Sequence, residues 1–179
     1  MEELITAIGN DSVNRVVAKA GPYNFNTSAM SCGSALCINR TLTIEAEVPG
    51  AVVLNATGKW RVFKIESGGT ATLIGLNITG GHPQASGKNN AGGIYVGTGG
   101  RATLIDSNVY ENKALGDGGG IYVGIGNTNS EPGHATLIDS NVYENSGRKA
   151  GGGLLIEGTA ELTNVNLYEN HAGWVDLSF

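Results

Sequence analysis

Three tyrosine–glutamate pairs recur along the chain and could bind a polysaccharide. A tyrosine ring stacks on the apolar face of a sugar, and a carboxylate accepts hydrogen bonds from sugar hydroxyls or coordinates calcium. The alternative is that duplication of a repeat copied residues that only face solvent, because like charges in one column repel each other. The candidate binding residues are Tyr110 with Glu111, Tyr143 with Glu144, and Tyr168 with Glu169.

Two aspartates, Asp106 and Asp139, occupy equivalent positions of a repeated segment and could form a catalytic pair. If one coil separates them, their carboxylates lie about 5 Å apart, the spacing that a retaining glycosidase needs. Gly75 and Asn164 stand at the same position in the neighbouring copies, however. An aspartate at a strand corner commonly caps a turn. The sequence therefore predicts no catalytic residue and favours a protein that is not an enzyme.

The histidines and cysteines do not predict a metal site. His82 and His171 belong to one column, but two intervening coils place them about 14 Å apart. Two cysteines are too few for a structural zinc site, which needs four ligands. Cys32 and Cys37 could instead close a small loop as a disulfide in an oxidising compartment. We therefore expect no metal and no cofactor.

All these residues lie in or around an internal repeat. The eleven residues ATLIDSNVYEN occur at 102–112 and again at 135–145, and related segments start at positions 71 and 160. Spacings of 31, 33 and 25 residues are typical of a solenoid or a propeller, whose units bury their apolar faces against each other. A propeller blade needs four antiparallel strands and about 40 residues, more than the shortest interval provides. A solenoid is therefore predicted.

Within each copy the apolar residues alternate with the period of a β-strand. The alternation slips by one step at Asp106, which indicates that the chain turns a corner there. A glycine-rich bend and another apolar strand follow each copy, in AGGIYV, GGGIYV and GGGLLI. Three short strands per unit predict an all-β, single-stranded parallel β-helix solenoid of about five coils. The inward residues of one copy are Ala102, Leu104, Ser107 and Val109.

An asparagine ends each copy, and we expect these asparagines to form a structural ladder rather than a ligand site. In stacked coils, each amide bonds to the backbone and to the next asparagine. The members of this ladder are Asn112, Asn145 and Asn170.

The combination of V-Y-E-N, a short loop and G-G-G-I-Y resembles the paired F-x-x-N and G-G-A-I motifs of the polymorphic outer membrane protein repeats. More broadly, the chain resembles the right-handed parallel β-helix superfamily that includes pectate lyases. The resemblance covers about residues 41–179 and implies a right-handed solenoid. Lyases of this superfamily hold calcium with clustered acids and use an arginine or lysine as base, but no acid cluster accompanies Arg101 or His134. The resemblance thus implies the coil geometry and not an activity.

The two ends of this single domain are expected to differ. Residues 1–40 are predicted to form a short cap helix and a first irregular coil, and Leu4, Ile5 and Ile8 belong to the apolar face of the helix. Such a cap covers the open sheet edges. At the other end the chain runs HAGWVDLSF, and Trp174 and Phe179 could plug the last coil or bind another chain.

The composition restricts the partners and leaves the compartment open. A net charge of -5 and a pI near 5.1 argue against nucleic acid as the main partner. No run of 18 apolar residues exists, so no membrane span is predicted, although peripheral association stays open. The opening MEELITAIGND lacks the pattern of a secretory signal, so the chain either stays inside the cell or is a trimmed form. The cysteine pair and five N-x-S/T sequons favour an extracellular or organelle-lumen location.

Together these features predict a non-enzymatic β-helical scaffold or interaction module. It would bind a protein partner or a glycan through its outer ladders, its loops or its open C-terminal end, as a peripheral subunit of a larger assembly or alone. The alternative is a protein that binds or cleaves a polysaccharide. A groove in which acids cluster around a base would distinguish the alternative, and the sequence contains no such cluster.

Overall fold

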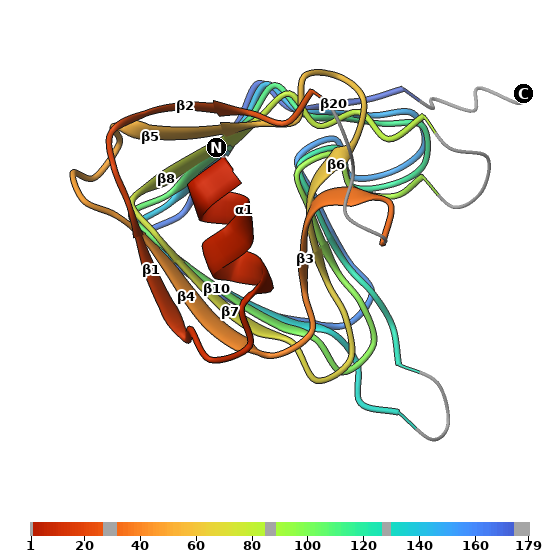
Figure 1. Ribbon diagram of the computed structural model, residues 1–179. Helices are drawn as coiled ribbons and strands as arrows, with labels where there is room; N and C mark the ends of the chain where they lie inside the picture. The colour runs from red at the N-terminus through yellow and green to blue at the C-terminus, as the bar shows by residue number, and fades with distance from the viewer. Residues whose placement is uncertain (1, 27–31, 85–88, 127–129, 174–179) are drawn as a thin grey trace, which may run out of the picture.

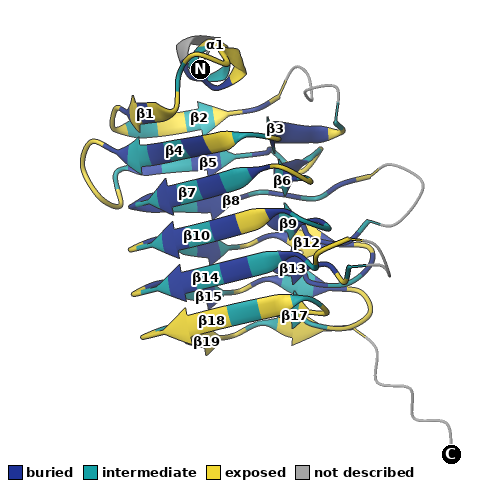
Figure 2. Cartoon of the chain, turned by 90° about the horizontal axis from the view of Figure 1, so that it is seen from below, coloured by how far each residue is buried: buried dark blue, intermediate teal, exposed yellow. Residues whose placement is uncertain are grey.

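The computed structural model describes residues 2–26, 32–84, 89–126 and 130–173. These residues form a parallel β-solenoid of about five turns with one short helix at its N-terminal end. Seen along the axis, the coils wind around a single hydrophobic core (Figure 1). Seen from the side, they lie one above another (Figure 2). The predicted fold class is therefore confirmed.

Four parallel sheets run along the solenoid, and each takes one strand from successive coils. Sheet A contains β1 (Arg15–Ala18), β4 (Thr41–Ala46), β7 (Thr70–Ile74), β10 (Arg101–Ile105), β14 (His134–Ile138) and β18 (Thr159–Thr163). Sheet B contains β2 (Gly21–Asn24), β5 (Val52–Asn55), β8 (Leu76–Thr79), β11 (Asn108–Tyr110), β15 (Asn141–Tyr143) and β19 (Asn166–Tyr168). Sheet C contains β3 (Ser34–Ile38), β6 (Arg61–Ile65), β9 (Ile94–Val96), β13 (Ile121–Val123) and β17 (Leu154–Ile156). Sheet D contains β12 (Lys113–Ala114), β16 (Ser146–Gly147) and β20 (His171–Ala172).

The register of the sheets turns the sequence repeat into ladders of like residues. Leu104 pairs with Leu73 on one side and with Leu137 on the other, and Leu137 pairs with Leu162. Equivalent ladders stack Val109 on Val142 in sheet B and Ile121 on Leu154 in sheet C. The side chains of these ladders are fully buried in the middle coils, as the alternation of the sequence predicts.

Sheet D was not predicted, because the sequence indicated three strands per coil. In this sheet Lys113 pairs with Ser146, and Ser146 pairs with His171. Each strand has two residues and follows directly after an asparagine corner, before the glycine-rich bend. A strand of two residues is too short to display alternation, so the sequence carried no signal for it.

Helix α1 (Glu2–Gly9) lies across the first coil, as Figures 1 and 2 show, and covers that end of the core. Leu4 and Ile8 are buried against the core, as predicted for its apolar face. Arg40 holds the end of the helix, because its guanidinium donates to the carbonyl oxygens of Ile8 at 2.7 Å and Asn10 at 3.0 Å. A cation at this end also interacts favourably with the helix dipole.

Candidate functional site

The predicted tyrosine column exists, but its rings are stacked on one another. The ring centroids of Tyr110 and Tyr143 lie 5.1 Å apart and those of Tyr143 and Tyr168 lie 4.9 Å apart, with interplanar angles of 5° and 1°. A sugar needs a free ring face, and within this column the faces are occupied by neighbouring tyrosines. Tyr110 and Tyr168, at the two ends of the column, each have one ring face that no described ring covers, and Tyr110 pairs with Thr79 on that side. The column is therefore a poor polysaccharide platform along its length.

The glutamates beside these tyrosines lie at a corner of the coil. Glu111, Glu144 and Glu169 have φ angles of 51°, 53° and 53°, in the left-handed region that residues other than glycine rarely adopt. All three are exposed to solvent. Burial, and secondarily the charge of Glu111, raises the pKa of Tyr110. The three carboxylates repel each other in one exposed column, an arrangement that favours solvation over a shared ligand.

Asp106 and Asp139 stand at the other corner of their coils. Their φ angles are 48° and 50°, close to the 51° of Asn164 in the last coil. Gly75 occupies the same corner in the coil before. Asn164 donates from Nδ2 to Oδ1 of Asp139 at 2.9 Å, and both aspartates are exposed. This position requires a residue that tolerates positive φ, which explains the two aspartates structurally.

Arg101 and His134 are the basic residues that the sequence analysis compares with the catalytic base of the lyases. They are adjacent in sheet A. His134 is engaged with threonine hydroxyls, with Nδ1 at 2.8 Å from Oγ1 of Thr159 and Nε2 at 3.2 Å from Oγ1 of Thr136. Among the described residues, no group of three or more histidine, cysteine, aspartate or glutamate side chains could hold a metal ion. The structure therefore does not assemble an acid cluster around this base.

The predicted asparagine ladder is present as a buried structural element. Asn112 is fully buried, and its Nδ2 donates to the carbonyls of Ile78 at 3.0 Å and Tyr110 at 2.9 Å. Its backbone N–H donates to Oδ1 of Asn145 at 3.0 Å, and Asn145 repeats the contact with Asn170. Each amide thus satisfies backbone groups of its own coil and of a neighbouring coil.

Sequence reasoning missed a polar pocket on the outside of sheet C. Tyr122 lines this pocket, and its hydroxyl donates to Oε2 of Glu157. Burial, followed by this hydrogen bond, raises the pKa of Tyr122 to about 12. The pocket has a volume of about 240 Å³, and Asn90, Asp117 and Lys149 also line it. The repeated GGIY motif was the signal that could have found it, because it stacks Tyr95 on Tyr122 with ring centroids 5.3 Å apart.

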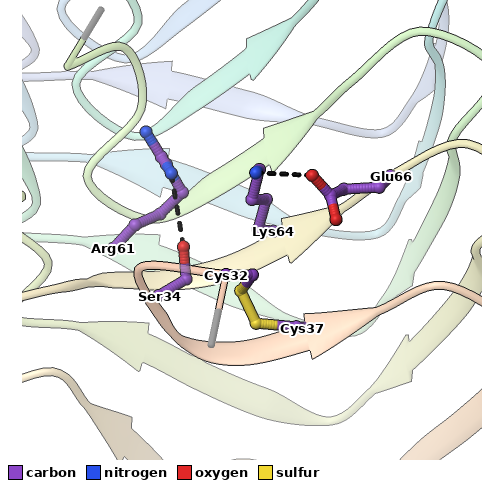
Figure 3. The surroundings of a disulfide bond; sticks show 6 residues. All are labelled: Cys32, Ser34, Cys37, Arg61, Lys64 and Glu66. Atoms are coloured by element: carbon purple, nitrogen blue, oxygen red, sulfur yellow. Dashed lines mark hydrogen bonds and ion pairs between the residues drawn. A yellow bond between two sulfur atoms is a disulfide. The ribbon is translucent and has the colours of Figure 1, made fainter. Parts of the chain in front are cut away.

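A disulfide joins Cys32 and Cys37 beside a buried arginine (Figure 3). Arg61 is 7% exposed, and burial lowers its pKa to about 10. Its guanidinium donates to Oγ of Ser34 at 3.3 Å and to the carbonyl of Asn90 at 2.5 Å, and it lies 4.9 Å from the ring centroid of Tyr95. These contacts fasten the first two strands of sheet C to the loop before β9, which indicates a structural role.

Among the residues that the structure describes, nothing covers the inward face of the last coil. Leu162 and Leu167 belong to the inward ladders, yet they are 40% and 51% exposed. Their equivalents in the two coils before are at most 1% exposed. Figure 2 shows β18 and β19 as mostly exposed, whereas strands of the inner coils such as β14 alternate between buried and less buried residues. Trp174 and Phe179, which were considered as a plug or contact, lie outside the described residues.

Comparison with protein-family models, curated proteins and solved structures found no match to this chain. In the part of the chain that the structure describes, no helix has the length and apolar character needed to cross a membrane.

Proposed function

We propose that this protein is a non-enzymatic β-helical interaction module that binds a protein partner through its open C-terminal end. The observation that carries this proposal is the exposure of Leu162 and Leu167, whose counterparts in the inner coils are buried. Unpaired strand edges and exposed apolar side chains both favour association with another chain. The outward faces, by contrast, offer stacked tyrosine rings and solvated corner residues.

A covalent cross-linking experiment tests this function. The photoreactive residue p-benzoylphenylalanine replaces Leu167 in one sample and Val48 in the other, because these side chains have similar exposure, 51% and 54%. After irradiation in an extract of the source cells, we expect a specific cross-linked product from position 167 only. Equal products from both positions, or none from position 167, would overturn the proposal.

Glycan binding is the second candidate function, and the pocket at Tyr122 is the observation that favours it. Carboxylate, amide and hydroxyl groups converge there in a recess of about 240 Å³, a size that fits a small polar ligand. A glycan array followed by titration of any hit against Glu157→Gln tests this candidate. An unchanged affinity in that variant, or an array without hits, contradicts it.

An extracellular or organelle-lumen location is proposed together with this function. The disulfide between Cys32 and Cys37 supports it, because disulfides persist in oxidising compartments. The proposed relationship to polymorphic outer membrane protein repeats and to the pectate-lyase-like superfamily agrees with the parallel coils, and it adds no activity. Peripheral attachment to a larger assembly follows from binding at one end of the solenoid.

A further inference from the structure

Among the described residues, the last coil lacks contacts that each inner coil makes with the coil after it. The ladders of the inner coils show which groups would provide these contacts. In the buried ladder, the backbone N–H groups of Asn112 and Asn145 each donate to Oδ1 of the next asparagine. The N–H of Asn170 has no acceptor among the described residues. An asparagine Oδ1 placed one layer further would occupy the equivalent position.

In a second asparagine ladder, on the outside of sheet B, the hydrogen bonds run in the opposite direction, because each asparagine donates to the asparagine of the coil before it. Asn108 donates from Nδ2 to Oδ1 of Asn77 at 2.9 Å, and Asn141 donates in the same way to Asn108 at 2.8 Å. Asn166 donates to Asn141 at 2.8 Å, and its own Oδ1 accepts nothing from the described part of the chain. Within the described residues, the N–H and Nδ2 of Asn170 and the Oδ1 of Asn166 thus lack the asparagine partners that the inner coils provide, and a layer containing two asparagines would supply them.

The apolar and aromatic contacts at this end are also incomplete. Leu162 and Leu167 present inward-ladder side chains without a following layer. Tyr168 ends the tyrosine column and is 45% exposed. A strand that follows the spacing of the repeat would cover all three side chains, because each coil does the same for the coil before it.

The acidic charge of the last coil favours a basic binding partner over a second copy of this chain. Residues 154–173 contain Glu157, Glu161 and Glu169 but no lysine or arginine. A second copy of this chain would bring further like charges against these glutamates, which disfavours it as the occupant. A partner with basic residues opposite these glutamates gains attraction instead. A planar guanidinium can also stack on the free face of Tyr168.

We propose that the open end accepts an extended, basic segment of another protein as the next layer of the solenoid, parallel to β18 and β19. This inference rests on the proposed function and specifies its partner. The segment has apolar residues opposite Leu162 and Leu167, an asparagine opposite Asn170, and lysine or arginine opposite Glu161 and Glu169. Main-chain hydrogen bonds to a sheet edge supply affinity in this mode of binding, and alternate side chains supply specificity.

Synthetic peptides based on the chain's own repeat test the proposal. Residues 134–145, HATLIDSNVYEN, align with residues 159–170 without a gap, so this sequence is a template for the next layer. The basic peptide carries Thr136→Lys and Glu144→Lys, and the acidic peptide carries Thr136→Glu with Glu144 retained. Fluorescence anisotropy of labelled peptides is expected to give at least about tenfold tighter binding of the basic peptide to the intact protein.

Two protein variants test whether the peptide binds at the last coil. A matched control distinguishes a loss of binding from a folding defect. Leu167→Ser should abolish binding of the basic peptide, and Glu169→Lys should remove or reverse the preference for it. Glu111→Lys is the matched control, because Glu111 has the same corner conformation and exposure in a coil that is already covered. This control should leave both affinities unchanged.

The outcomes separate this inference from the proposed function. Equal binding of both peptides, or equal effects of Glu169→Lys and Glu111→Lys, would overturn the inference that the partner is basic. The proposed binding at the C-terminal end would still stand. If no peptide binds although position 167 forms a cross-link, the inference of an added strand is rejected and the proposed function is kept. A concentration-dependent doubling of mass that Leu167→Ser removes would identify a second copy as the occupant. Binding that begins only after residues 174–179 are deleted would identify that segment instead, and both results overturn the inference.

Discussion

Asn145 is joined to Asn170 twice, because its backbone N–H and its side-chain Nδ2 both donate to Oδ1 of Asn170, at 3.1 and 3.0 Å. Asn145 is 1% exposed, and its Nδ2 also donates to the carbonyls of Val109 and Tyr143. One buried amide therefore connects three successive coils. The ladder of such amides stabilises the corner that follows sheet B.

We expect Asn145→Ala to lower the free energy of unfolding by about 2–4 kcal/mol, because it leaves several buried backbone groups without partners. Asn166→Ala is the control, since Asn166 makes a comparable amide contact on the exposed surface and should cost less than about 1 kcal/mol. Chemical denaturation at equilibrium measures both values. Similar losses in the two variants would mean that burial does not decide the strength of the ladder.

A side chain at Gly120 should destabilise the fold. A Cβ atom there would lie 2.6 Å from the carbonyl oxygen of Gly153 and 2.9 Å from the amide of Asn145. We expect Gly120→Ala to cost about 1–3 kcal/mol through overpacking. Gly9→Ala, at the end of α1, has no atom within 4 Å of the new methyl group and should be neutral or slightly stabilising. Thermal denaturation of both variants checks this difference.

Replacing a corner glutamate with glycine should increase stability. Glu111 has a φ of 51°, a conformation that costs a residue with a Cβ about 1 kcal/mol and glycine almost nothing. We expect Glu111→Gly to gain about 0.5–1 kcal/mol, whereas Glu161→Gly in the extended strand β18 should lose a similar amount. Denaturant midpoints give the comparison. A loss of stability in Glu111→Gly would show that the carboxylate makes a contact more valuable than the relief of strain.

The hydroxyl of Tyr122 should ionise late in a pH titration. The pKa of this hydroxyl is raised from 10.0 to about 12, so folding favours its neutral form. The resulting stabilisation is present below pH 10 and is lost as the pH rises toward 12. Ultraviolet absorbance of phenolate should show a late step that Tyr122→Phe removes and Glu157→Gln moves to lower pH. A titration without this late step would contradict the buried hydrogen bond.

Loss of the disulfide should weaken the fold without abolishing it. Cys32 and Cys37 are 5 positions apart in the sequence. A bridge that closes a loop of this length contributes about 2 kcal/mol by restricting the unfolded chain. We expect the double variant Cys32→Ser, Cys37→Ser to unfold at lower denaturant concentration by that amount. Treatment of the wild-type protein with a reductant should reproduce the shift and should leave the double variant unchanged. A reductant effect on the variant would point to another cause.

The core of the solenoid could be predicted because the repeat places like residues at equal steps. Leu104 and Leu137 stand at the same position of two identical segments, so any stacked arrangement pairs them. The alternation on each side of Asp106 also predicted the corner. The asparagine ladder followed from the same spacing, and its hydrogen bonds occur where the sequence placed them.

The repeated GGIY motif could have placed Tyr122 beside Tyr95, but the other polar residues of the pocket come from segments outside the repeats. Asn90 and Asp117 belong to loops of unequal length, and Glu157 follows a strand of the next coil. Spacing in the sequence does not show that such residues meet. The left-handed conformation of Glu111 was also missed, since glutamate has no preference for that conformation and so provides no signal.

Helix α1 also determines how copies of this protein could grow into larger particles. Stacked parallel strands with bare edges at both ends propagate as fibrils, because every added chain presents a fresh edge. Here α1 covers one end, so a chain that used its bare end to attach would present only a helix to the next chain. Elongation through these edges stops after one addition. We therefore expect the helix to limit edge-to-edge polymerisation as well as to cover one end of the core.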